Sequence, residues 1–236
     1  MPNYVRNDMT FPKKFKKLIV DKDGNVDFNL AVPMPDTLDI EDSSTAKYAI
    51  YYYSSDRCQK SKKELLKDKL FRNALKMAVS KLHNIADITE YITDSYVESV
   101  IGYAHFEAKG ISEEEIKKAE DDFYEYGRKL VFNANEYKYL TWYPWANDKW
   151  GTKWNAMETC CFDLDKKMMS VSFQTAWGAP EAWLKTLCKE YHVPFTLEWE
   201  EEQGFRGKYT SDGQKFESED LPWAEDDDED YYDEDD

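Results

Sequence analysis

The hydrophobic pattern of the chain changes period twice, and these changes constrain the fold more than any single motif. The opening segment NYVRNDMTF shows a mixed apolar and polar alternation that is typical of a short strand. From about Lys60 to Tyr137 the apolar residues recur at three- and four-residue steps, which indicates about three helices. Beyond a tryptophan-rich stretch the period returns to two, in TCCFDLD, MMSVSFQTAW and PFTLEWEEE. We therefore predict strands on both sides of a helical block.

Local signals place the turns and helix ends within this pattern. Lys166 and Lys167 separate two alternating runs and predict a hairpin, and the Asp212-Gly213 pair in GFRGKYTSDGQKF predicts a second one. APEAWLKTLCKEYHV has the spacing of a helix between the two hairpins. In the helical block, Ser112 and Glu115 form a predicted capping box.

The first half carries two less regular segments. GNVDFNLAVPMPDTL predicts a strand-like run followed by a turn, because Pro33 and Pro35 forbid a continuing helix. AKYAIYYYSS, at residues 46–55, is compatible with either a strand or a helix.

The order strand, helices, strand, strand, helix, strand is that of an α+β ferredoxin-like sandwich with an antiparallel sheet. The helical block would enlarge its first crossover. We predict N-terminal strands of the core in residues 1–58, a helical insertion at 59–137, the second half of the core at 138–216, and an acidic disordered tail at 217–236.

The negative charge of the chain is concentrated in this tail. The net charge is −17, but thirteen of the 48 acidic residues lie in residues 217–236, which contain no Lys or Arg. Residues 1–216 thus carry 35 acids against 31 bases. The body is nearly neutral and the tail is a polyanion, whose composition predicts disorder in the free chain.

The cysteines and the hydropathy pattern predict a soluble protein of the host cytoplasm. Cys58, Cys160, Cys161 and Cys188 form no CxxC pair and no metal-binding spacing, so reduced thiols are expected. The N-terminus has no apolar signal region, and no stretch approaches the roughly 18 apolar residues of a membrane span.

Several motifs resemble one known family. KWGTKWNA, SFQTAWGAP and LEWEEEQGFRGKY are similar to the signature run of the YubB ferredoxin-like family of phage and plasmid proteins, and MPNYVRNDMTF and DFNLAVPMPDTL resemble its N-terminal strand and turn. The resemblance covers residues 1 to about 40 and 140–216. The family favours Asn at Lys149 and Ser-Pro at Gly178-Ala179. The resemblance implies a ferredoxin-like fold and a mobile-element origin, and it implies no catalytic residues.

Four aromatic residues near position 145 have the composition of a base-stacking platform, with lysines interleaved. Stacking on an aromatic ring is worth about 1–3 kcal/mol per base, but each Trp can instead bury about 150–250 Å² in a core. We expect core and corner packing, with stacking as the alternative. The possible stacking residues are Trp142, Tyr143, Trp145 and Trp150.

No catalytic constellation is evident, so we predict a protein that is not an enzyme and has no cofactor. Glu200 to Glu202 could hold a metal ion only with Asp163 and Asp165, and carboxylates at strand ends are usually solvated. His83, His105 and His192 stand alone, without a metal-binding or nucleophile motif.

These features favour a non-enzymatic phage or plasmid protein that binds and blocks a host nucleic-acid-handling protein, for example a defence nuclease. The acidic tail would compete with nucleic acid for a basic groove of that partner. The alternative is a single-stranded nucleic-acid-binding module that its own tail inhibits; the nearly neutral body makes direct nucleic-acid binding the weaker hypothesis. The predicted partner-binding residues are Trp223, Asp226, Asp227, Asp228, Glu229, Asp230, Tyr231, Tyr232, Asp233 and Glu234.

Overall fold

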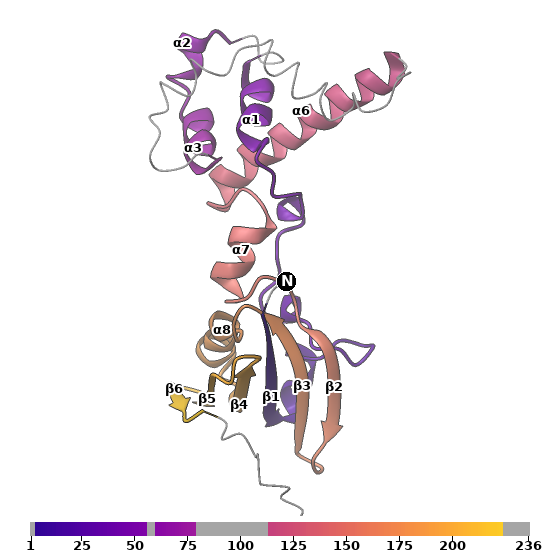
Figure 1. Cartoon of the computed structure of the whole chain (residues 1–236), viewed down its shortest axis with the longest axis vertical. Coiled ribbons are helices and arrows are strands. Elements are labelled where there is room, and N and C mark those ends of the chain that lie inside the picture. The colour runs from indigo at the N-terminus through magenta and orange to yellow at the C-terminus, as the bar shows by residue number, and fades with distance from the viewer. Residues whose placement is uncertain (1–2, 56–59, 79–112, 224–236) are drawn as a thin grey trace, which may run out of the picture. The chain divides into compact units, whose positions relative to one another are not determined.

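The computed structural model describes residues 3–55, 60–78 and 113–223, in two compact units (Figure 1). The sheet unit combines Met1–Pro33 with Ala146–Asp236, and the helical unit is Met34–Trp145. The helical unit thus takes more of the chain than the insertion expected at 59–137. The extra residues include 46–55, which form a helix.

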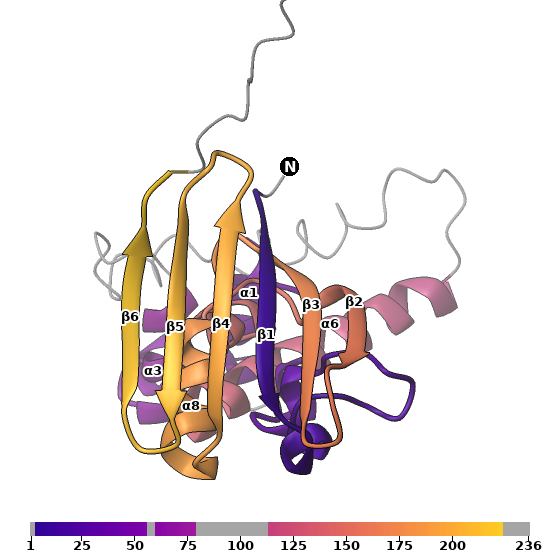
Figure 2. The same ribbon diagram turned by 90° about the horizontal axis from the view of Figure 1, so that it is seen from below.

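The sheet unit contains a six-stranded antiparallel sheet in the order β2-β3-β1-β4-β5-β6 (Figure 2). Its first four strands, with a helix between β3 and β4, have the ferredoxin-like order with β1 at the centre, which confirms the predicted fold class. The hairpin β5–β6 extends the sheet beyond β4. The strands are β1 (Tyr4–Pro12), β2 (Met157–Asp163), β3 (Met168–Ala176), β4 (Pro194–Glu201), β5 (Arg206–Asp212) and β6 (Phe216–Leu221).

One face of this sheet is packed and the opposite face is open. Alternate residues of β1, including Val5 and Met9, are fully buried. Helix α8 (Glu181–Tyr191) packs on this side with Trp183, whose ring contacts that of Phe28 at a centroid distance of 4.7 Å. In Figure 2 α8 lies behind the strands, and no described element of the sheet unit crosses the near face.

A polar residue, Asn7, occupies the buried row of β1. Its amide nitrogen donates to the carbonyl of Val5 and to Thr175 Oγ1, both at 2.9 Å. These bonds offset part of the cost of burying the amide, because they satisfy its nitrogen, while its oxygen has no hydrogen-bond partner among the described residues. Because Asn7 stands in the buried row, the opening segment does not alternate strictly between apolar and polar residues.

The segment after β1 corrects one prediction. Residues 24–32 were expected to include a strand, but they contain an isolated bridge between Val20 and Val26 and the 3-10 helix η2 (Phe28–Leu30). The Asp27 carboxylate accepts from Asn29 N at 2.9 Å and so caps η2, which favours a turn over an extended run. A further 3-10 helix, η1 (Lys13–Leu18), follows β1 directly.

Both predicted hairpins are present. Asp165 accepts hydrogen bonds from the backbone of Lys167 and Met168 at the β2–β3 turn. Gly213, with φ of 93°, follows Asp212 at the β5–β6 turn. The expected tail at 217–236 begins too early, because its first five residues belong to β6, which pairs with β5 along its whole length.

The helical unit is built around α6. The apolar side of α6 packs with α1 and α3 into one core that includes Ile50, Phe71, Leu75 and Leu130. Residues 46–55 favour a helix because this core accepts Ala49 and Ile50 on one side. The elements are η3 (Asp36–Leu38), α1 (Ala46–Ser55), α2 (Lys62–Leu65), α3 (Lys69–Ala78), α6 (Glu113–Glu136) and α7 (Trp142–Lys149), the last of which contains the boundary between the units.

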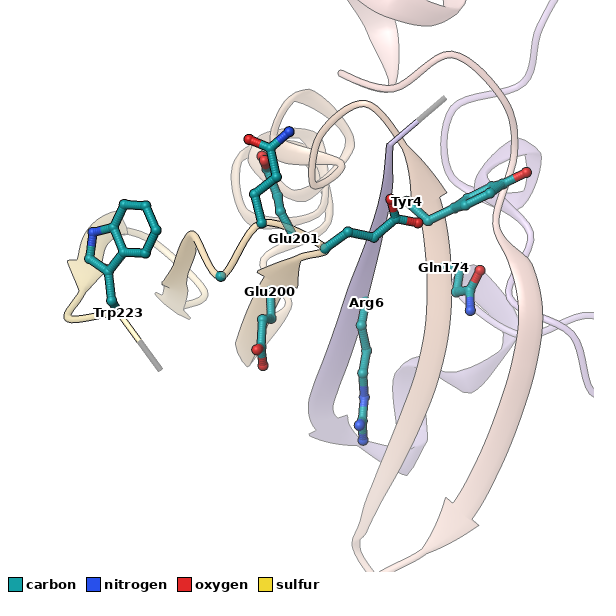
Figure 3. Close-up of a pocket in the computed structure, with 9 residues that line it drawn as sticks. Tyr4, Arg6, Gln174, Glu200, Glu201 and Trp223 are labelled. Carbon is teal, nitrogen blue, oxygen red and sulfur yellow. The ribbon is translucent and has the colours of Figure 1, made fainter. Parts of the chain in front are cut away.

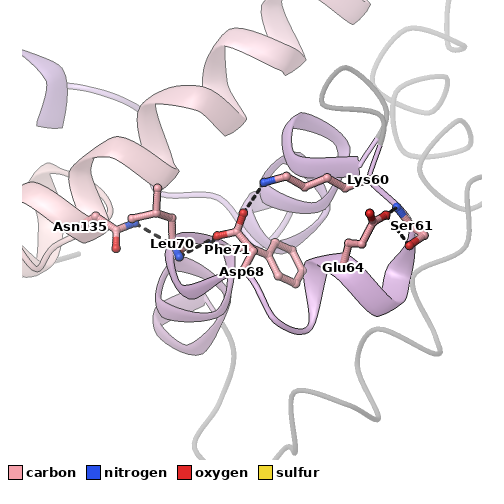
Figure 4. A network of polar contacts seen from close by, with 7 residues as sticks. All are labelled: Lys60, Ser61, Glu64, Asp68, Leu70, Phe71 and Asn135. Atoms are coloured by element: carbon pink, nitrogen blue, oxygen red, sulfur yellow. Dashed lines mark hydrogen bonds and ion pairs between the residues drawn. The ribbon is translucent and has the colours of Figure 1, made fainter.

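Carboxylates cap two of these helices (Figure 4). The Glu64 side chain accepts from Ser61 N at 2.9 Å and from Ser61 Oγ at 2.6 Å, as in a capping box. Asp68 accepts from Leu70 N at 2.8 Å at the start of α3 and pairs with Lys60. The pKa values of both carboxyl groups lie below their ordinary values, for Glu64 chiefly through Ser61 and for Asp68 chiefly through Lys60.

Some predictions fall outside the described residues. The capping serine Ser112 and the helical pattern from Ile88 to Val100 are among them. Within the described residues, each helix is too short or too polar to cross a bilayer.

Candidate interaction site

The β4–β5 turn brings three glutamates to one end of the sheet. Glu201 N donates to the carbonyl of Phe205 at 2.8 Å, and Gly204 N donates to the carbonyl of Glu201 at 2.9 Å. Gly204 has a φ of 86°, which places a left-handed residue in the four-residue loop 202–205. The loop holds Glu202 next to the strand residues Glu200 and Glu201.

These glutamates line a pocket of about 690 Å³, which we call the acidic pocket (Figure 3). Residues from β1, β3, β4, the β4–β5 loop and the segment after β6 meet there, although they are distant in sequence. Its lining residues are Tyr4, Arg6, Gln174, Glu200, Glu201, Glu202, Gln203, Gly204 and Trp223.

The carboxylates of the acidic pocket are not paired with the arginines that lie across from them. Within the described part of the chain, the side chains of Glu200, Glu201 and Glu202 have neither an ion pair nor a hydrogen bond. Glu200 lies opposite Arg6 in β1 and Arg206 in β5. Both guanidinium groups bond elsewhere.

Arg6 pairs with Asp8 on its own strand at 3.0 Å. Arg206 Nε donates to the carbonyl of Pro222 at 2.6 Å. The acidic pocket therefore has three carboxylates without an ion pair in the described residues and a single lining cation, which is itself engaged.

Trp223 forms the aromatic wall of the acidic pocket. Its ring lies against that of Phe205, with a centroid distance of 4.5 Å and an interplanar angle of 51°. Trp223 is 60% exposed and Phe205 45% exposed, so the pair presents apolar surface to solvent. The hydrogen bond from Arg206 to Pro222 fixes the chain immediately before Trp223. The last residue that the structure describes thus lies at this pocket.

The open face of the sheet carries charged side chains of both signs. Two rows of paired residues cross it, one through Asp8, Glu198, Lys208 and Glu219 and one through Arg6, Glu200 and Arg206. Only Lys208 and Glu198 are joined across strands there, at 2.9 Å. Acids outnumber bases in these rows, and no aromatic side chain stands among them.

Of the predicted partner-binding residues, the structure describes only Trp223. The acidic residues Asp226 to Asp230, together with Tyr231 to Glu234, lie outside the described residues. Sequence reasoning missed Tyr4, Arg6, Gln174 and Phe205, because no local motif signals that strands so far apart in sequence share an edge.

The predicted stacking residues do not form one platform. Trp145 is 5% exposed and Trp150 4% exposed, so neither offers a ring face to a base. Trp150 Nε1 donates to the carbonyl of Val32 at 3.0 Å, and this bond explains its burial at a corner of the sheet unit. Trp142 and Tyr143 are half-buried, contact each other edge to face and belong to the helical unit.

A different aromatic group is exposed on the sheet unit. Lys153 Nζ lies 4.3 Å from the ring centroid of Trp154 and 4.7 Å from that of Trp177. Trp177 is 46% exposed and has a φ of 74°, an uncommon backbone conformation for a bulky residue. Trp154 lies in the motif KWGTKWNA and Trp177 in the motif SFQTAWGAP. The family resemblance of these motifs was the only sequence signal for this group.

The structure separates the carboxylates considered for a metal site. Glu201 lies opposite Val5 at one end of the sheet, whereas Asp163 lies opposite Met169 at the other. The Asp165 carboxylate accepts hydrogen bonds in the β2–β3 turn, and the donating backbone N–H groups of Lys167 and Met168 hold its pKa below the ordinary value. Within the described residues, no group of three or more His, Cys, Asp or Glu side chains could hold a metal ion.

Of the three histidines, only His192 is described. It ends α8 with a left-handed backbone, and its Nδ1 lies 2.9 Å from the carbonyl oxygen of Gly213. His83 and His105 lie outside the described residues.

One comparison with known families agrees with the fold. Residues 149–236 match the model of a family described as a ferredoxin-like domain in Api92-like protein. A crystal structure of a protein api92 from Yersinia pseudotuberculosis is 11% identical, with a TM-score of 0.41 over 95% of this chain and 100% of that chain. No curated protein matches the chain. The YubB resemblance and the mobile-element origin stay predictions.

Proposed function

We propose that this chain is a non-enzymatic interaction protein of phage or plasmid origin. It binds a host nucleic-acid-handling protein and blocks it by competing with nucleic acid for a basic groove. The observation that carries the proposal is the position of Trp223, which places the start of the acidic tail at the acidic pocket.

The charge of this surface suits a basic partner. Residues 224–236 add ten carboxylates with no Lys or Arg directly beyond the acidic pocket. A dense row of negative charges attracts a groove lined with Lys and Arg and raises the association rate. Docking would cost the tail its chain entropy. Binding should depend strongly on salt, because salt screens the attraction between exposed charges.

The open face gives less support to the alternative, a single-stranded nucleic-acid module. Ferredoxin-like RNA-binding sheets stack bases on aromatic residues of the open face. Here the two central rows carry Asp8, Glu198 and Glu200 in comparable places, and these carboxylates repel phosphate.

Affinity capture followed by a competition assay tests the proposal. The full chain and a charge-neutralised tail variant, with the ten acids after Trp223 changed to Asn or Gln, are immobilised and exposed to a bacterial lysate. Each captured protein is then assayed for binding to labelled DNA or RNA. We expect the wild-type chain to abolish that binding in a salt-sensitive manner and the neutralised variant to lose most of the effect.

Two results would count against the proposal. One is equal inhibition by the neutralised variant, which would exclude the tail mechanism. The other is retardation of a labelled single strand by the neutralised variant itself at low salt, with no retardation by the wild type, which would favour the autoinhibited module.

A further inference from the structure

We infer that the acidic pocket and the Phe205–Trp223 pair form a docking site for an arginine side chain in a basic segment of the partner. This inference rests on the proposed function and adds a second contact, on the folded body, to that of the tail. It predicts a preference for Arg over Lys, which a polyanion alone does not require.

Charge complementarity selects a cationic occupant. Glu200, Glu201 and Glu202 line the pocket, and their side chains have no partner within the described residues. The lining cation Arg6 is engaged by Asp8 at 3.0 Å. A cation that enters the pocket therefore meets carboxylates that form no ion pair within the described residues.

The exposed aromatic pair selects arginine among the cations. A guanidinium group is planar, stacks on aromatic rings and can bond a carboxylate through two parallel hydrogen bonds. Trp223 offers a largely exposed ring beside the glutamates, and tryptophan is the strongest cation–π partner among the side chains. An ammonium group can use the charge but not the planar contact.

The site is also held in place before any partner arrives. Arg206 bonds the carbonyl of Pro222, Phe205 packs against Trp223, and the Gly204 turn fixes the glutamate loop. Groups that are already ordered lose less entropy on binding than a free tail does. The pocket can therefore orient the bound segment of the partner.

Fluorescence anisotropy with two peptides tests the inference on the full chain. The probes are labelled nonapeptides of arginine and of lysine, which carry the same charge. We expect the wild-type chain to bind the arginine peptide about three- to tenfold more tightly, since cation–π contacts contribute on this scale. Trp223→Ala should reduce the ratio to about one, and Trp223→Phe should keep part of it.

A double substitution tests the carboxylates. Glu200→Gln with Glu202→Gln should weaken binding of both peptides more than the matched pair Glu136→Gln with Glu190→Gln, which removes two exposed carboxylates outside the pocket. The inference is overturned if Trp223→Ala keeps the Arg preference, or if the two double variants bind alike.

The tail-neutralised variant separates this inference from the proposed function. If the pocket contributes as inferred, this variant binds both peptides more weakly but still prefers arginine. Loss of the preference on tail neutralisation alone would assign it to the carboxylates of the tail, because Tyr231 and Tyr232 remain in this variant, and would contradict the pocket. Unchanged blocking of the captured partner would instead contradict the tail mechanism and leave the pocket result standing.

Discussion

Gly127 of α6 faces the backbone of Ala49 in α1 so closely that a Cβ atom on Gly127 would lie 2.1 Å from the Ala49 carbonyl oxygen. The two helices therefore cross in direct backbone contact. Glycine, which normally weakens a helix interior, is required here for packing rather than for its backbone freedom.

Gly127→Ala should destabilise the helical unit, although the same change in an exposed helix stabilises it by about 1 kcal/mol. The added methyl group overlaps backbone, which cannot rotate away, so α1 and α6 must separate. We expect a loss of about 1–3 kcal/mol, as for overpacked cores. Urea unfolding followed by circular dichroism measures it, with Asp122→Ala on the exposed side of α6 as the control. A gain in stability would contradict the close crossing.

Asp68 should make the stability of α3 sensitive to acid. Its pKa is lowered, chiefly by the bond with Lys60. The stabilisation is therefore complete above the unfolded pKa of about 4 and is lost as the pH falls through the lower folded value. Asp68→Ala should cost about 1 kcal/mol at neutral pH.

Asp68→Asn is the control, because it keeps a capping oxygen and cannot ionise. The difference in melting temperature between wild type and this variant should be present at pH 7 and shrink in strong acid. A difference that stays constant with pH would show that the charge of Asp68 contributes nothing.

Two tyrosines should ionise late in an alkaline absorbance titration. Burial, as the largest cause, raises the pKa of Tyr126 and of Tyr209 to about 12, against an ordinary value of about 10. Because the folded value is the higher one, the associated stability is complete below about pH 10 and is lost as the pH rises through 12. Tyr126→Phe and Tyr209→Phe should each remove one late-titrating group. Unchanged titration curves in both variants would refute the assignment.

Gly207→Ala should disturb the packing of Trp199. A Cβ atom at Gly207 would lie 2.7 Å from Cζ2 of the Trp199 ring, which also stacks with Tyr209. We expect a loss of about 1–3 kcal/mol and a shift in tryptophan fluorescence. Gly178→Ala is the matched control, since the nearest atom to its added Cβ lies at 3.8 Å and its φ is not positive. Equal stability of the two variants would contradict this packing.

The sheet was predictable where burial follows the pleat. In β3 and in the first half of β4 the buried and more exposed residues alternate as the sequence does, and both hairpin turns carry their own polar signals. Residues 46–55 were ambiguous because their choice of structure depends on α6, more than fifty residues later. Residues 217–221 of β6 were assigned to the tail because their acidic side chains suggested disorder, whereas the backbone ladder with β5 holds them in the sheet.

The candidate site was predictable only in part. Trp223 was selected as a binding residue from the composition around it, and Glu200 to Glu202 were noticed only as possible metal ligands. That these groups lie in one pocket depends on β1 pairing with β4, which places Tyr4 and Arg6 beside them. The conformation of Trp177 had no sequence signal, because its positive φ arises at the end of β3.

The central position of β1 has a consequence for how the molecule reaches its native state. In the register of the sheet, Pro12 pairs with Met168 and Val5 with Glu201. During synthesis β1 leaves the ribosome before its partner strands and must wait, with its apolar row unpaired, until β3 and β4 have followed. The helical unit, Met34–Trp145, is complete before either partner strand exists. Closure of the sheet should therefore be the late and slow step of folding, when an exposed β1 is most vulnerable to aggregation and to proteases.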